Sequence, residues 1–155
     1  MLRSPAGDEH EVAANRFAAE LLLPAAEVVP LVRNQPLSVE IVRSIAHRFS
    51  ASLTAAAFQC VEVKEESCAA VVSIDGIRHS YRPSRAWNYF IPVGEMLDDR
   101  SVAAGLGFEE GSAAAEVPAF AWTTSKRIAP GAKFLEDSIY LPPHNMTLSI
   151  LTAIS

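Results

Sequence analysis

Residues 11–24 of this 155-residue chain read EVAANRFAAELLLP, and no other stretch says as much about the fold. Apolar side chains recur at every third or fourth position from Ala14 to Leu21, which is the spacing of one face of a helix. Pro24 ends this helix or begins the next, because proline lacks the backbone N–H that a helix interior needs. We therefore expect helical structure over residues 8–33, interrupted at Pro24.

Two further helices are expected after a linker at residues 34–36. Ser38 and Ser52 are suitable N-caps, and each is followed by apolar residues at helical spacing. Helix, tight turn and helix together predict a helix-turn-helix-like segment over residues 37–65.

From Cys68 onward the pattern is typical of strands. Residues 68–74 and 77–82 flank Asp75-Gly76, a strong signal for a β-hairpin. Later strands are predicted over residues 117–123, 134–141 and 146–154, and residues 83–116 are expected to be loops with one short helix near 101–106. The predicted fold class is α+β: N-terminal helices, then a mostly antiparallel α/β domain over residues 66–155.

Composition excludes several classes of protein. No apolar run approaches the roughly 18 residues of a membrane span, and residues 1–5 lack the apolar core of a secretory signal, so we expect a cytoplasmic protein. The net charge is −5 and the basic residues are scattered, which argues against binding to DNA. Cys60 and Cys68 match no zinc or redox spacing and are interpreted as buried, reduced thiols.

Residues 11–24 closely resemble the segment that follows the zinc motif in the ImmA/IrrE family of metallopeptidases. The shared pattern is Glu-x-x-Ala-Asn-x-Phe-Ala, followed by Leu-Leu and Pro. The resemblance implies that Glu11 occupies the third zinc-ligand position and that residues 1–33 correspond to part of the zinc-peptidase domain. Asn15 shares a helical stripe with Glu11 and is expected to orient its carboxylate.

The rest of the zinc site is missing from this sequence. In the family, a preceding helix carries His-Glu-x-x-His, in which two histidines bind zinc and the glutamate is the general base. Here His10-Glu11 imitates the start of that motif, but Ala14 stands where the second histidine belongs, so we interpret His10 as an ordinary exposed residue. One carboxylate does not hold catalytic zinc, and the chain alone is predicted to have no catalytic residues and to be inactive.

The later parts of the chain are similar to the same family. Residues 37–65 resemble its helix-turn-helix-like segment, and residues 66–155 resemble a GAF-like sensor domain, which implies a small-molecule ligand. Aromatic side chains in that domain either line a cavity or form plain core, namely Trp87, Tyr89, Phe90, Phe120 and Trp122. Arg82 and Arg85 either face an anionic ligand or are solvated.

Two hypotheses follow. The chain is the C-terminal part of a zinc metallo-endopeptidase that, in its family, cleaves a helix-turn-helix repressor in stress or mobile-element regulation. Alternatively, it is a stand-alone module that senses a ligand or binds a repressor without cutting it. In either case the apolar face of Glu11–Leu23 needs cover, which we expect from the helices at 38–63 or from a second copy of the chain.

Overall fold

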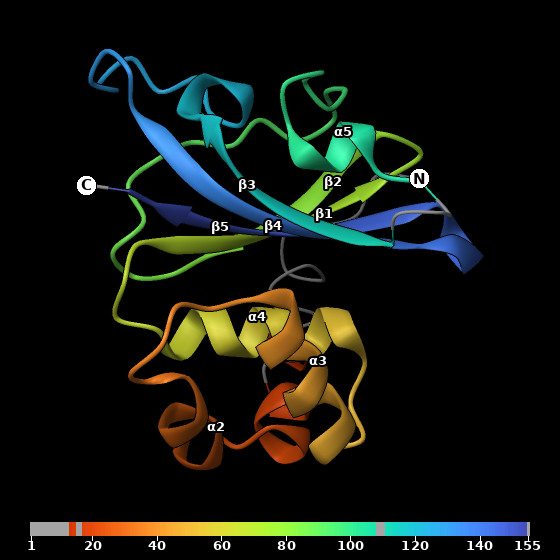
Figure 1. Ribbon diagram of the computed structural model, residues 1–155. Coiled ribbons are helices and arrows are strands. Elements are labelled where there is room, and N and C mark those ends of the chain that lie inside the picture. Colours follow the sequence, from red (N-terminus) through yellow and green to blue (C-terminus); the bar gives the residue numbers. More distant parts are fainter. Residues whose placement is uncertain (1–12, 15–16, 108–110, 155) are drawn as a thin grey trace.

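A computed structural model describes residues 13–14, 17–107 and 111–154, and Figure 1 shows two layers. A group of helices lies against one face of a five-stranded sheet, and α5 (Val102–Gly105) lies on the opposite face. The predicted mixed α+β class is therefore confirmed.

The helical layer forms where periodicity and capping residues predict it. Residues 17–22 are helical, and α2 (Ala25–Val32), α3 (Val39–Arg48) and α4 (Leu53–Val63) follow. Both predicted serine caps are present: Ser38 Oγ accepts from the N–H of Ile41 at 3.2 Å, and Ser52 Oγ accepts from that of Ala55 at 3.1 Å. None of the helices in the described part is long and apolar enough to cross a bilayer.

The sheet is antiparallel throughout, in the order β2-β1-β5-β4-β3. Its strands are β1 (Cys68–Ile74), β2 (Ile77–Pro83), β3 (Ser112–Pro118), β4 (Lys133–Leu141) and β5 (Met146–Ala153). The hairpin between β1 and β2 turns at Asp75 and Gly76, whose φ values of 54° and 75° match the predicted Asp-Gly turn.

The prediction of a strand over residues 117–123 is wrong. The strand β3 lies earlier, and Ala119–Ala121 forms a short 3-10 helix, η1. Alanine has low strand propensity, so the run from Ala113 to Ala115 gave no strand signal, whereas aromatic residues after Pro118 imitated one. Pro118 is the last residue of β3 and pairs with Lys133 of β4.

The two faces of the sheet bury two separate apolar clusters. On one face, side chains of β1, β4 and β5 pack against the helices. On the other, Trp122, Phe134 and Trp87 pack over Ala69 and Val71 of β1. Because β1 is buried on both faces, its sequence reads as a nearly continuous apolar run.

Both cysteines are free and buried, as predicted. Cys60 lies on α4 and Cys68 begins β1, and both belong to the cluster under the helices. Burial raises the pKa of Cys60 to about 12 and that of Cys68 to about 11. Since the thiolate is the reactive form, these thiols are expected to be inert near neutral pH.

Asp137 of β4 connects the sheet to the helical layer. Its Oδ2 accepts a hydrogen bond of 2.8 Å from the backbone N–H of Val39, the first residue of α3. Burial raises the pKa of Asp137, the bond from Val39 opposes that shift, and nearby Glu40 adds to it. The folded chain therefore holds the Asp137 proton more tightly than the unfolded chain does.

Replacing Asp137 by asparagine is expected to change how stability depends on pH. A raised folded pKa means that stability falls as pH rises from the unfolded value, about 3.9, through the folded value. Asparagine keeps an acceptor for Val39 but does not ionise. The stability of D137N relative to the unaltered chain should therefore increase as the pH rises from 3 to 7. Urea denaturation at both pH values measures this, with exposed Asp99→Asn as control. If D137N is more stable than the unaltered chain at pH 3 but not at pH 7, the predicted direction of the pH dependence is contradicted.

Candidate functional site

The residues predicted to belong to the zinc site, Glu11 and Asn15, lie outside the residues that the structure describes, as does His10. Within the described ranges, no group of three or more histidine, cysteine, aspartate or glutamate side chains could hold a metal ion. The described histidines are exposed and lie on three different elements: His47 on α3, His79 on β2 and His144 in η2 (Pro142–His144).

The helix at residues 17–22 follows Asn15 and Arg16 in sequence and carries an exposed apolar face. Phe17 is 68% exposed and Leu21, one helical turn later, is 67% exposed. Leu22 beside them is 56% exposed. We call these three side chains the 17–22 apolar face. The prediction that the helices at 38–63 cover this face is wrong for these residues.

This helix is nevertheless fixed to α4. Leu23, at its end, is fully buried, and its carbonyl accepts a hydrogen bond of 2.9 Å from Nε2 of Gln59 on α4. The same Gln59 amide group donates to Glu20 Oε2 at 3.3 Å, and Glu20 Oε1 accepts from the N–H of Ala25 at 3.2 Å. These polar contacts hold the helix that carries the 17–22 apolar face against α4.

A groove of about 580 Å³ separates the 17–22 helix from α4. Ala18, Ala19 and Leu22 form one wall, and side chains of α4, including Phe58, form the other. Arg82 lies at this groove, where it pairs with Glu62 at 2.7 Å and lies over the Phe58 ring, 5.3 Å from its centroid. Arg82 is thus engaged within the chain, whereas Arg85 is exposed.

The second helix of the predicted helix-turn-helix pair, α4, is largely enclosed. It contacts α2, α3, β1 and β2, and Glu62 is its one exposed residue. Gln59, its one residue with an amide side chain, is 7% exposed and bonded to Leu23. A recognition helix needs a free face with cationic or amide side chains, and α4 presents none.

Of the two alternatives for the five aromatic residues, a shared cavity is not what the structure shows. Trp87 and Tyr89 pack with Phe134, with ring centroids 5.0 to 5.1 Å apart. Trp122 is fully buried, whereas Phe90 and Phe120 are 60% and 57% exposed. A shallow groove of about 500 Å³ adjoins Phe120, but the other four aromatics do not line it.

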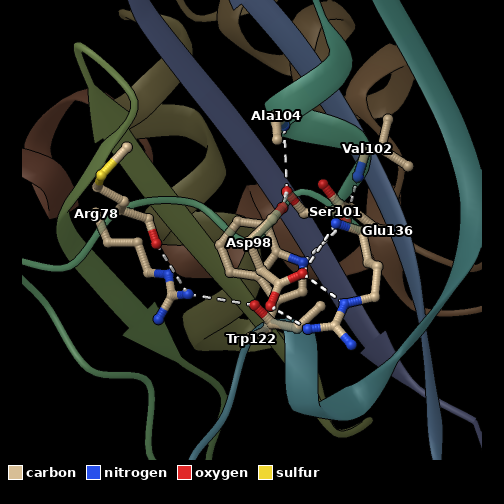
Figure 2. A network of polar contacts seen from close by, with 10 residues as sticks. Arg78, Asp98, Ser101, Val102, Ala104, Trp122 and Glu136 are labelled. Carbon is tan, nitrogen blue, oxygen red and sulfur yellow. Dashed lines mark hydrogen bonds and ion pairs between the residues drawn. The ribbon is translucent and has the colours of Figure 1, made fainter.

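Sequence reasoning missed a buried carboxylate on the same side of the sheet. Glu136 of β4 is fully buried and accepts four hydrogen bonds. The donors are the N–H groups of Val102 and Ala103 at 3.0 and 2.8 Å, Trp122 Nε1 at 2.8 Å and Ser138 Oγ at 2.8 Å. Figure 2 shows this carboxylate at the start of α5, beside Trp122. Four donors replace the water that burial removes.

Arg78 of β2 is the second buried charge near Trp122. Its guanidinium lies 5.6 Å from the Trp122 ring centroid and donates to three backbone carbonyls, those of Pro92, Met96 and Ala121. Burial lowers the pKa of Arg78 from its ordinary value. These hydrogen bonds connect β2 to the loop at residues 92–96 and to η1, so Arg78 has a structural role.

An ion pair at the edge of this network orders the loop before α5. Asp98 Oδ1 accepts a hydrogen bond of 2.8 Å from Arg100 Nε, and this contact lowers the pKa of Asp98 to about 2. The Arg100 guanidinium also lies 4.4 Å from the centroid of the exposed Phe120 ring. These contacts position Ser101, the N-cap of α5.

Comparison with known proteins places the groove in a recognised domain. Residues 2–60 match the family model of the IrrE N-terminal-like domain. That range contains the 17–22 apolar face and most of both groove walls. No curated protein matches the chain. The match over residues 2–60 is therefore consistent with the predicted resemblance to the ImmA/IrrE family of metallopeptidases.

Proposed function

We propose that this chain is part of a zinc metallo-endopeptidase in which Glu11 supplies the third metal ligand. The observation that carries the proposal is the 17–22 apolar face beside its groove, within the segment that matches the family. Exposed apolar side chains of this size mark a surface that another protein element covers. In the complete enzyme that element is the helix carrying His-Glu-x-x-His, which these 155 residues do not contain.

The chemistry of zinc explains why both helices are required. Two histidines four positions apart share one face of a helix and chelate one ion, and a carboxylate from a second helix completes the three protein ligands of a catalytic site. When bound, the zinc lowers the pKa of its water toward 7. The sequence supplies one expected ligand, Glu11, out of three, so we expect the chain alone to be inactive.

The groove suits the approach of a second helix. Ala18 and Ala19 on its wall are small, so a helix backbone can come close to them. Leu22 offers apolar contact at the same level, and Gln59 holds the 17–22 helix at a fixed position relative to α4. In its family such an enzyme cleaves a helix-turn-helix repressor, and we extend that substrate class to the complete enzyme of this chain.

Zinc titration tests the proposal. Residues 1–155, alone and fused to a His-Glu-x-x-His helix from an ImmA/IrrE-family protein, are compared by calorimetry. We expect one tightly bound zinc per fused chain and none at comparable affinity in the chain alone. Glu11→Gln in the fusion should weaken zinc binding roughly 100-fold or more, whereas exposed Glu27→Gln in α2 should leave it unchanged.

Cleavage of a helix-turn-helix repressor provides the second readout. The fusion is expected to cut the repressor in a chelator-sensitive reaction, and the unfused chain is not. Clean, chelator-sensitive cleavage by residues 1–155 alone would contradict the claim of inactivity. Zinc binding that does not change in E11Q would contradict the assignment of Glu11 as a ligand.

A stand-alone binding module is the second candidate function, and the same exposed apolar face favours it. Without a catalytic helix, Phe17 and Leu21 remain available to a repressor that is bound and not cut. A repressor that binds residues 1–155 with the same affinity as the fusion, and loses that affinity in a Phe17→Ser, Leu21→Ser variant, supports this module. Dependence of binding on the fused helix excludes it.

A further inference from the structure

One edge of the sheet is open. Strand β3 is the last strand in the order and lies beside β4, and residues 112–116 are all exposed. Three of these residues are alanines, so no large side chain shields the strand on either face. An exposed, flat edge of this kind is a template for pairing with another strand.

The phase of the ladder shows which backbone groups face outward. The N–H of Tyr140 donates to the carbonyl of Gly111 at 2.7 Å, so these residues form a hydrogen-bonded pair at the start of β3. Such pairs alternate along an antiparallel ladder, so Ala113 and Ala115 bond to β4. The N–H and C=O groups of Ser112, Ala114 and Glu116 therefore point away from the sheet, and no described residue is recorded bonding to them.

The opposite edge of the sheet is covered where β2 begins, and this distinguishes it from the edge at β3. Along β2, the N–H of Arg78 donates to the carbonyl of Glu95 at 2.9 Å, and the N–H of Gly94 donates to the carbonyl of Arg78 at 2.7 Å. The N–H of Leu97 donates to the carbonyl of Gly76 at 2.8 Å. The segment at 94–97 thus covers the outer side of the first residues of β2, and β3 has no such cover within the described residues.

We propose that β3 pairs antiparallel with β3 of a second copy of this chain, about a two-fold axis at Ala114. In this register Ala114 faces Ala114 of the second copy, and Ser112 faces Glu116. These are the three residues whose backbone groups point outward, so they pair without leaving a gap in the ladder. The two sheets become one continuous sheet.

Charge favours this register of the two copies. Glu116 is the one charged residue in β3, and the two-fold axis at Ala114 places it opposite a serine. Sliding the axis to Glu116 would set two carboxylates directly opposite each other, which is destabilising. Lys133 of β4 lies 3.6 Å from Glu116 and further reduces its charge at the interface. The pairing is independent of the zinc proposal, because it uses no residue of the metal or groove region.

Proline substitution tests the pairing without disturbing the fold. The N–H of Ala114 points outward, so Ala114→Pro removes no bond to β4 but blocks the partner strand. We expect sedimentation up to ~1 mM chain to show a mass of twice 16.7 kDa for the unaltered protein and 16.7 kDa for A114P. Ala114→Thr keeps the N–H and should remain a dimer. Circular dichroism checks that each variant is folded.

Cysteine cross-linking tests the register. A hydrogen-bonded pair has Cα atoms about 5.5 Å apart, within the range of a disulfide, so A114C should form a disulfide-linked dimer on oxidation. Ser112→Cys is equally exposed, but it faces Glu116 of the second copy and should not cross-link to itself. The native thiols are buried and should not compete.

Each outcome decides the proposal. Dimer loss in A114P together with selective cross-linking of A114C supports it. A chain that stays monomeric at every concentration overturns it, as does equal cross-linking of S112C and A114C. A dimer that persists in A114P but disappears in the Phe17→Ser, Leu21→Ser variant overturns it as well, because the copies then meet through the 17–22 apolar face.

Discussion

Glu136→Gln is expected to remove about 3–5 kcal/mol of stability, although it deletes no atom from the core. The reason lies in what surrounds the carboxylate. Its two oxygens are fully buried and accept from two backbone N–H groups, the Trp122 indole and the Ser138 hydroxyl. A glutamine amide replaces one oxygen by an NH₂ group, which directs its own hydrogens at these donors.

The environment cannot adapt to this change at low cost. Ser138 can rotate its hydroxyl, since Ser149 Oγ lies 2.7 Å away as another partner. The N–H groups of Val102 and Ala103 are fixed by the backbone of α5, and the Trp122 indole is fixed by its buried ring. At least one of these donors loses its acceptor in a site that excludes water, and the start of α5 loses its anchor.

Urea denaturation of E136Q and of Glu95→Gln measures the effect, since Glu95 is an exposed glutamate whose side chain should be tolerant of substitution. We expect a large fall in the urea midpoint for E136Q and a change within ~0.5 kcal/mol for E95Q. If the two variants unfold at the same urea concentration, the carboxylate does not anchor this side of the sheet.

Elements with periodic side chains were predictable, and β3 was not. Apolar spacing and serine caps located α3 and α4, and Asp75-Gly76 located the first hairpin. The strand at 112–118 carries alanine where a strand signal needs branched or aromatic side chains. It exists because β4 offers it backbone partners, and such long-range pairing leaves no mark in a single sequence.

Buried charged residues were also not predictable from the sequence, because their burial depends on distant segments of the chain. Glu136 and Asp137 are adjacent in β4, so their side chains must lie on opposite faces of the sheet. This alternation was the only sign in the sequence that one of the two carboxylates could be buried on the face away from the helices. The sequence does not tell which side excludes water, because that depends on α5 and Trp122 folding over Glu136. Arg78 is likewise buried through loops that are distant from it in sequence.

The sequence pattern predicted the candidate site, and the structure describes only part of it. Spacing predicted one apolar helix face over Glu11–Leu23, but spacing cannot say what covers such a face. The structure adds that Phe17, Leu21 and Leu22 remain exposed beside a groove, whereas Leu23 is buried. The roles of Glu11 and Asn15 stay predictions, because both lie outside the described residues.

Lys64→Met should cost about 2–4 kcal/mol, the second large effect expected. Lys64 follows α4 and is 4% exposed. Its ammonium group donates to the carbonyl of Val32, the last residue of α2, at 2.7 Å and to that of Gln35 at 2.6 Å. A cation at the end of α2 also interacts favourably with the partial negative charge of the helix terminus.

Methionine fills nearly the same volume but cannot donate, so K64M isolates the polar contribution from packing. Two carbonyls then lose a charged donor, and the Val32 carbonyl, whose bond to Lys64 is buried, has no easy access to water. The ion pair with Glu66 adds little, because it spans 3.4 Å and Glu66 is half exposed. Lys133→Met on the surface is the matched control and should change stability by at most ~1 kcal/mol. Equal urea midpoints for K64M and K133M would show that α2 does not need this cation, and α2 would then be held by its apolar contacts with α4 alone.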